Sequence, residues 1–114
     1  MVAWYRQPAG EHFKQRIEVI SKGAEWIADE PPAMRLRKMK RTWGSCSAHG
    51  VITLNPLLIR APKACIDYVI AHELCHLREM NHSSAFYALQ ETLYPPWREA
   101  KAQLQARAHI YLQM

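Results

Sequence analysis

The stretch that decides the fold is IAHELCHLREMNH, residues 70–82, which sets three histidines and a glutamate in a largely apolar run. On a helix, His72 and His76 stand at i and i+4, so they project from one face with Cβ atoms about 5–6 Å apart. Two imidazole nitrogens at that separation can bind one metal ion at about 2.0–2.1 Å each. Glu73 lies about 100° around the helix axis, where its carboxylate can contact a water on the ion. The spacing therefore predicts metal binding by the two histidines and a catalytic role for Glu73.

The helix that carries this motif is predicted to run from Pro62 to about Met80 and to lie at the centre of the molecule. Proline is tolerated in the first helical turn, and apolar side chains cover nearly every side of this helix. Only Asp67 and Arg78 are obvious contacts with solvent. An acid inside such a helix needs a partner because an unpaired buried charge is costly.

The third protein ligand has three candidates in the sequence. His82 lies just beyond the expected helix end, and Asn81 tolerates the left-handed conformation that would turn the chain back. Glu79 and Glu91 are the alternatives. Three protein ligands and a water are typical of a catalytic zinc site, whereas four indicate a closed structural site. Cys46 is a weak candidate for a fourth ligand, so we expect an open site.

Hydrophobic periodicity organises the rest of the chain into a mixture of helices and strands. A helix is expected over residues 11–28 and should stop at the DEPPA segment, residues 29–33, because consecutive prolines cannot continue it. Residues 34–43 and 51–54 are expected to form the strands of a hairpin whose loop ends at Gly50. Two shorter helices should follow, one over residues 84–93 capped by Ser83 and one from Pro96 to the C-terminus. With no repeat or long linker, we expect residues 1–114 to form a single domain.

The composition is that of an ordinary globular protein. The 114 residues are 49% hydrophobic and 22% charged, and no apolar run approaches the ~18 residues that a membrane span requires. The N-terminus lacks a signal-peptide pattern, and three cysteines without framework spacing agree with a reducing compartment, so a cytoplasmic location and no membrane partner are predicted. The net charge of +5 gives only a mild attraction to anionic partners.

Two blocks of this chain resemble a known family. WGSCSAHGVITLNPLLIRAP, residues 43–62, followed by IDYVIAHELCHLREMNHSSAFYAL, residues 66–89, is similar to the YgjP-like metallopeptidase family, and the likeness extends from about Trp4 to Trp97. The resemblance implies an α+β, minimal zincin-like fold: a small twisted sheet with a β-hairpin packed on a central HExxH helix, plus flanking helices. It also implies one zinc ion per chain held by His72, His76 and His82, with Glu73 as the catalytic acid and base.

The predicted function is therefore a zinc-dependent hydrolase, a metallopeptidase that cleaves peptide bonds through a zinc-activated water with Glu73 as general base and then acid. An exposed strand edge beside the metal could bind an extended peptide substrate. The expected edge is Gly50, Val51, Ile52 and Thr53. His49 or Tyr87 could stabilise the oxyanion, although each also reads as an ordinary loop or packing residue.

Three other functions stay open at this point. The metal could serve hydrolysis of a non-peptide substrate, such as a nucleotide phosphoanhydride or a small amide. The chain could be a nucleic-acid-associated protease similar to the SprT-like zincins, an idea prompted by a basic run: Arg35, Arg37, Lys38, Lys40 and Arg41. No aromatic stacking platform interleaves that run, which favours a solvated strand face. The third alternative is a zinc-binding module without catalytic activity.

Overall fold

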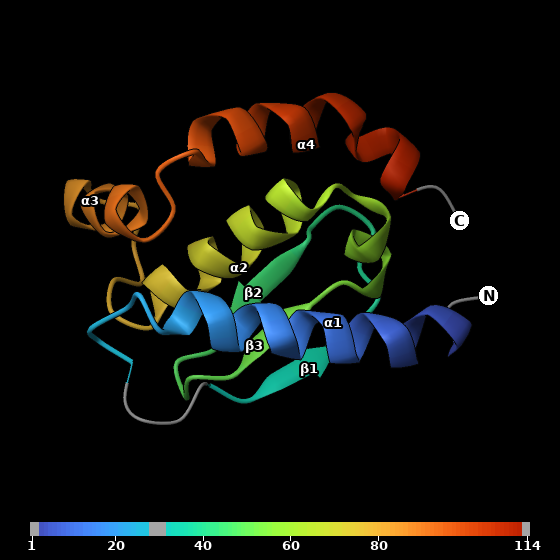
Figure 1. The fold of residues 1–114 in the computed structure, drawn as a ribbon, viewed down its shortest axis with the longest axis horizontal. Coiled ribbons are helices and arrows are strands. Elements are labelled where there is room, and N and C mark those ends of the chain that lie inside the picture. The colour runs from blue at the N-terminus through green and yellow to red at the C-terminus, as the bar shows by residue number, and fades with distance from the viewer. Residues whose placement is uncertain (1–2, 28–31, 113–114) are drawn as a thin grey trace.

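The structure is a computed structural model that describes residues 3–27 and 32–112. Helix α2 (Lys63–His76) runs through the middle of the molecule, between α1 (Ala3–Ser21) and α4 (Trp97–Tyr111), and α3 (Ser84–Leu93) lies at one end (Figure 1). Helix α2 packs against the other three helices and against the sheet. The described residues thus form a small α+β fold with a central motif helix, as predicted.

The sheet has three short strands in the order β1-β3-β2. Strand β1 (Met34–Leu36) pairs parallel to β3 (Ile52–Leu54), and β2 (Gly44–Cys46) pairs antiparallel to β3. The expected hairpin strand over residues 34–43 is therefore wrong, because β2 takes that place. The buried Asn55 side chain explains the difference: its amide donates to the carbonyls of Met39 (2.8 Å) and Thr42 (3.1 Å). These bonds hold the intervening segment as a loop that crosses from β1 to β2.

Strand β3 is paired on both sides, which corrects the expectation that residues 50–53 form an exposed edge. Its first and last residues, Ile52 and Leu54, are fully buried. The free edge beside α2 belongs to β2 instead. The turn between the two strands does end at Gly50, whose φ of +82° is a conformation that glycine adopts without a steric penalty.

Helix α1 ends at Ser21, earlier than the predicted residue 28. After it the chain makes tight turns around Gly23, and the Trp26 indole then donates a hydrogen bond to the Leu74 carbonyl near the end of α2 (2.8 Å). This contact with α2 replaces a further helical turn. The predicted stop at residues 29–33 lies for the most part outside the described residues.

Helix α2 ends at His76, about one turn before the predicted Met80. Most of its side chains are buried, and Asp67 is among them, so the expectation that it contacts solvent is wrong. Its carboxylate accepts two hydrogen bonds from Arg16 of α1, at 2.8 and 3.0 Å. The Ser83 cap of α3 is confirmed, since its hydroxyl accepts from the Phe86 amide at 3.3 Å.

The core lies between α1, α2, α4 and β3. It is built from side chains of all four elements together with the short helix η1 (Pro56–Arg60), and its members include Phe13, Ile17, Leu54, Leu58, Ile70, Leu74 and Leu104. Within the described segments, every helix is too short or too polar to pass through a lipid bilayer.

Candidate metal centre

Three imidazole rings converge beside the end of α2. One ring nitrogen each from His72, His76 and His82 lies within 4.8 Å of the others, and no second group of this kind occurs among the described residues. The Nε2 atoms of His76 and His82 are only 3.1 Å apart. Two nitrogens bound at 2.0–2.1 Å to one tetrahedral ion stand roughly 3.3 Å apart, so the spacing fits a shared zinc-sized cation.

Hydrogen bonds on the far side of two rings fix which nitrogen faces the centre. The Nδ1 atom of His76 lies 3.1 Å from the Glu79 carbonyl, which can only accept, so Nδ1 carries the hydrogen. The Nδ1 atom of His72 lies 3.0 Å from Oε1 of Gln90, a side chain that is only 1% exposed. Both rings therefore turn an unprotonated Nε2 toward the centre, the arrangement that metal-ligating histidines commonly use.

Phe86 of α3 lies against all three rings. The ring centroid of this fully buried phenylalanine is 4.9 Å from His72, 4.7 Å from His76 and 4.9 Å from His82. His82 itself is exposed and follows the end of α2, and packing on Phe86 gives its ring a buried contact. Helix α3 thus positions the centre through Phe86 and Gln90 together.

The other candidate ligands do not join this group. Glu91 forms an ion pair with Arg98 at 2.6 Å, and Glu79 contributes its backbone carbonyl to the His76 ring. Cys46 lines the neighbouring hollow, but its sulfur is not among the three converging ligand atoms. Three converging ligand atoms from the described residues would leave one position of a tetrahedral ion open.

Glu73 is a buried carboxyl group next to the centre. The residue is 4% exposed, and its Oε1 atom has no hydrogen-bond partner among the described residues. Burial raises the pKa of Glu73 to about 7, and burial also lowers the pKa of His72 to about 4 and that of His76 below its usual value. At neutral pH the two rings are therefore free of competing protons, while Glu73 is poised to hold or release one.

Gly44 of β2 allows the sheet to approach Glu73 closely. A Cβ atom at this position would lie 3.1 Å from the Leu54 side chain, 3.1 Å from the Thr53 carbonyl and 3.3 Å from Cγ of Glu73. Any larger residue would push against the Glu73 side chain or against β3. This contact gives a physical reason for glycine in the WGSCS segment, residues 43–47.

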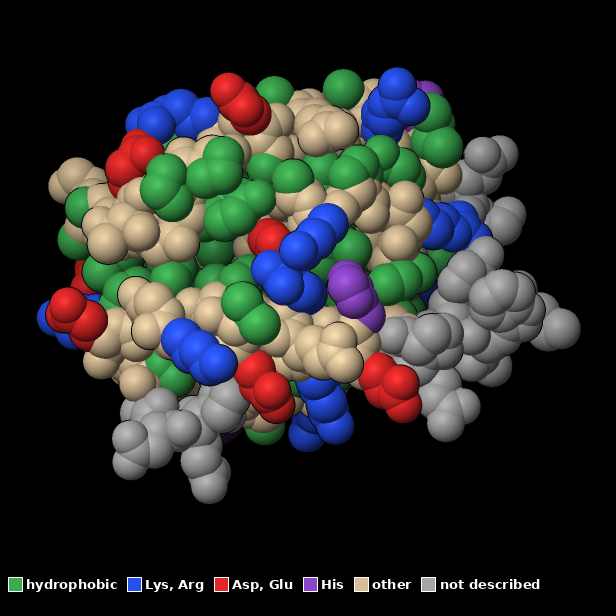
Figure 2. Space-filling model, viewed as in Figure 1, with side chains coloured by type: hydrophobic (Ala, Val, Ile, Leu, Met, Phe, Trp, Pro, Cys, Tyr) green, Lys and Arg blue, Asp and Glu red, His purple; other side chains and the backbone are tan. Residues whose placement is uncertain are grey.

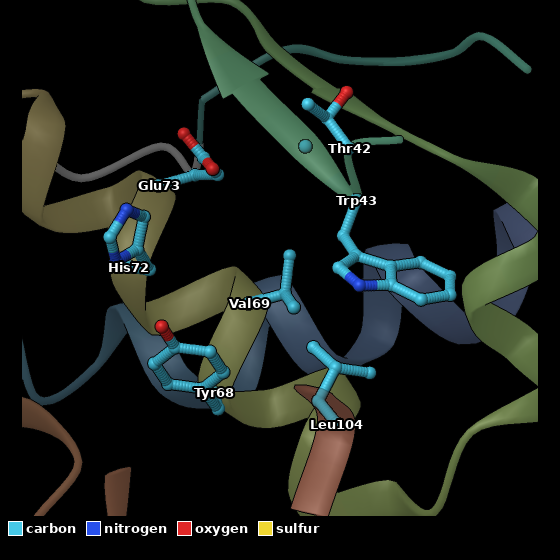
Figure 3. Close-up of a pocket in the computed structure, with 8 residues that line it drawn as sticks. Thr42, Trp43, Tyr68, Val69, His72, Glu73 and Leu104 are labelled. Atoms are coloured by element: carbon cyan, nitrogen blue, oxygen red, sulfur yellow. The ribbon is translucent and has the colours of Figure 1, made fainter. Parts of the chain in front are cut away.

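Two hollows flank His72 and Glu73. The apolar hollow, about 200 Å³, is lined chiefly by Trp43, Tyr68, Val69 and Leu104. Figure 3 shows Val69 inside it, with Trp43 on one side and His72 and Glu73 on the other. The polar hollow, about 330 Å³, lies on the other side and is lined by Ser45, Cys46, His76, Met80 and His82. Gly44 of β2 borders both hollows.

The remaining predicted substrate contacts fall into different places. His49 is exposed in the turn between β2 and β3 and lines neither hollow. Tyr87 is 38% exposed on α3, where its ring stacks on Trp97 at 5.6 Å and lies 6.4 Å from the His82 ring. Tyr87 therefore lies near the centre, whereas nothing places His49 there.

Sequence reasoning missed Phe86, Gln90 and Tyr68. A helical wheel over residues 84–93 puts Phe86 and Gln90 four residues apart on one face, a spacing that could have indicated contact with the preceding histidines. Tyr68 stands one turn before His72 on α2, and their ring centroids are 5.9 Å apart.

Comparisons with known proteins give the family of this chain and the fold that it shares. A family model described as YgjP-like, metallopeptidase domain, matches residues 1–107. The metallopeptidase zymogen abylysin of Pyrococcus abyssi superposes with a TM-score of 0.74 at 24% sequence identity, over 83% of this chain and 93% of that chain. The metallopeptidase zymogen jannalysin of Methanocaldococcus jannaschii gives 0.70 at 19% identity, over 84% and 96%. At these identities the two structures show a shared fold. No curated protein sequence matches this chain significantly.

Proposed function

The chain belongs to the YgjP-like metallopeptidase family, and we propose that it is a zinc peptidase in which His72, His76 and His82 hold the metal and Glu73 transfers the proton. Family membership makes it a metal-dependent peptidase with a peptide or protein substrate. The identity of the metal, the ligand set and the role of Glu73 are our proposal. The observation that carries it is the convergence of three ring nitrogens within 4.8 Å beside a buried carboxyl group.

Zinc suits this donor set. Neutral imidazole nitrogens are ligands that zinc prefers, and three of them with one open position are typical of catalytic zinc sites. When bound, the ion would supply the Lewis acidity that activates a water and polarises the scissile carbonyl.

Glu73 is suited to move a proton in both directions. A group whose pKa lies near the working pH can accept a proton from the attacking water and later return it to the leaving amine. Its pKa of about 7 without metal comes from burial, and no other acidic group lines either hollow. We therefore assign both proton transfers to this carboxyl group.

The edge of β2 is the proposed seat of the peptide backbone. At the two ends of β2, the Asn55 amide donates to the Trp43 carbonyl and the Ser47 amide donates to the Val51 carbonyl. Because bonded and non-bonded pairs alternate along an antiparallel ladder, the backbone groups of Gly44 and Cys46 face away from β3. An extended substrate can add to this edge by main-chain hydrogen bonds.

The basic run does not favour a second function. Its five side chains are exposed on β1 and the following loop, as expected for a strand face in contact with solvent. On the face in Figure 2, basic, acidic and apolar side chains are interspersed among the coloured residues.

We further propose that residues 1–114 act as one domain, since the Cα radius of gyration of 13.2 Å equals the roughly 13 Å expected for this length.

The test combines metal content with cleavage. We expect about one zinc per chain by elemental analysis, lost when His72, His76 or His82 is replaced by alanine. Glu73→Gln should keep the metal and lose cleavage of a mixed peptide library by at least about a hundredfold, the scale of general acid–base catalysis. His109→Ala, an exposed histidine on α4, is the matched control and should change neither quantity.

Two results would contradict the proposal. Full activity in Glu73→Gln would remove the assigned proton transfers. Turnover of nucleotides by the zinc-loaded protein, without cleavage of any peptide, would replace the proposed substrate class.

A further inference from the structure

The apolar hollow has the size and lining of a side-chain pocket. Val69 and Leu104 are 4% and 3% exposed, and Trp43 and Tyr68 supply aromatic surface. An apolar cavity of roughly 150 Å³ can hold a benzene molecule. The hollow of about 200 Å³ therefore has room for one large apolar side chain, whereas an acidic side chain would lose its hydration there and face the Glu73 carboxyl group.

The two hollows lie on opposite sides of the reacting groups. Both are bordered by His72, Glu73 and Gly44, and only the polar hollow extends to His76 and His82. A carbonyl that reacts beside Glu73 therefore places the peptide residues before and after the cleaved bond in different hollows.

The direction of β2 decides which residue enters which hollow. The apolar hollow borders the start of β2, at Trp43 and Gly44, and the polar hollow extends to Cys46 at its end. A peptide that adds antiparallel to β2 runs from the Cys46 side toward the Gly44 side. Antiparallel pairs are more common than parallel ones and slightly more stable per residue. The residue after the cleaved bond then lies at the apolar hollow.

We propose that the apolar hollow binds a large apolar side chain of the residue directly C-terminal to the cleaved bond, so that the enzyme cuts before leucine, methionine or phenylalanine. This inference rests on the proposed peptidase function and adds the substrate class to it. Val69 and Leu104 are the residues that set the depth of the pocket.

The Tyr68 hydroxyl adds a polar contact at this pocket. No protein group among the described residues bonds to it, and it is not among the buried polar atoms without a partner, so it reaches solvent. Figure 3 shows the hydroxyl on the side of the hollow nearest His72. A substrate backbone group beside the pocket can hydrogen-bond to this hydroxyl in place of water.

The test reads the new N-termini of peptides cleaved by the zinc-loaded protein, using mass spectrometry on a library with every residue type at each position. Cleavage before leucine, methionine or phenylalanine should exceed cleavage before glycine or aspartate by about tenfold or more in kcat/KM. Binding to Glu73→Gln, measured by fluorescence anisotropy with labelled peptides that differ only at this position, should show the same order without requiring catalysis.

Two pocket variants and a control separate this role from general packing. Leu104→Ala should widen the pocket and raise relative cleavage before tryptophan. Val69→Phe should fill it and reduce cleavage before leucine and phenylalanine about tenfold, mainly through KM, while cleavage before alanine persists. If Val69→Phe does not fold, Leu104→Ala and the binding series still decide. Ile110→Ala, 48% exposed on the same helix as Leu104, should leave the preference unchanged.

The outcomes distinguish this inference from the proposed function. Cleavage with no preference after the bond, with selectivity for the residue before it, or with a preference that both variants leave unchanged would overturn the pocket assignment alone. No cleavage of any library peptide, together with no peptide binding to Glu73→Gln, would overturn the proposed function and the pocket with it.

Discussion

Gln90 shows how a single buried side chain can set metal affinity from outside the ligand group. Its Oε1 atom holds the Nδ1 hydrogen of His72 at 3.0 Å, which turns Nε2 toward the centre. Gln90→Leu removes this acceptor at similar volume, so we expect zinc affinity to fall about 10- to 100-fold. Gln90→Glu keeps an acceptor for the Nδ1 hydrogen, so most of the zinc affinity should remain. Competition with a chromophoric chelator measures both, and wild-type affinity in Gln90→Leu would show that the bond does not orient His72.

Burial of Glu73 predicts a pH dependence of stability in the metal-free protein. The folded pKa of about 7 lies above the ordinary glutamate value of 4.5, so the folded state keeps a proton that the unfolded state loses between these values. The wild type must therefore lose stability as pH rises through this window, whereas Glu73→Gln has no such group. As pH rises through this window, the free energy of unfolding of Glu73→Gln, relative to that of the wild type, should increase by about 3 kcal/mol.

Urea denaturation at pH 5 and pH 8 after zinc removal checks this difference. Titration of the histidines is shared by both proteins and cancels. A difference that stays constant with pH would mean that the Glu73 carboxyl group is solvated in the folded state.

At the residue scale, local spacing predicted the histidines but not their supports. His72 and His76 are neighbours on one helix, so the sequence alone brings their rings together. His82 joins them only because the chain turns after His76 and its ring packs on Phe86, a contact between segments. Gln90 and Phe86 share one face of α3, but their contact with the histidines depends on how α3 docks on α2.

At the scale of elements, one ion pair joins the N-terminal helix to the motif helix. Arg16 of α1 and Asp67 of α2 form two hydrogen bonds at 2.8 and 3.0 Å, with side-chain exposures of only 19% and 10%. Removing one partner leaves the other charge largely buried, so Asp67→Leu should reduce the free energy of unfolding by about 3 kcal/mol. The double variant Arg16→Met with Asp67→Leu should recover much of that loss.

Thermal and urea unfolding of the two single variants and the double variant measure the coupling between these residues. Arg98→Met, which breaks an exposed pair with Glu91, is the control and should cost at most about 1 kcal/mol. Equal losses in the double and single Asp67 variants would show that Asp67 stabilises the protein without Arg16.

The elements that were predicted best are those in which the hydrophobic periodicity extends over many residues. All four helices are present, but α1 begins at Ala3 instead of residue 11, and α1 and α2 end earlier than predicted. Trp26 and Glu79, which the prediction placed in these helices, instead make the Trp26–Leu74 and His76–Glu79 hydrogen bonds. The strands are three residues each, too short for alternation to identify pairing partners. The parallel pairing of β1 with β3, and therefore the free edge at β2, could not be read from the sequence.

At the scale of the whole molecule, the core and the metal centre are built from different side chains. The core cluster contains Phe13, Ile70, Leu74 and their neighbours, and it includes none of the three histidines, Glu73 or Phe86. Zinc fingers, in contrast, unfold without metal because their cores are too small. Since this core draws on α1, α2, α4 and β3 together, we expect the fold to form without zinc.

Removal of zinc therefore should lower stability without unfolding the chain. Metal at a hundredfold excess over its dissociation constant contributes about 2.7 kcal/mol, which for a domain of this size corresponds to a shift in Tm of roughly 10 °C. Circular dichroism before and after chelation should show unchanged helical signal at 25 °C and the lower Tm, with His82→Ala insensitive to the chelator. Loss of the helical signal on chelation would mean that the histidine centre, and not the apolar packing around α2, holds α3 and the sheet in place.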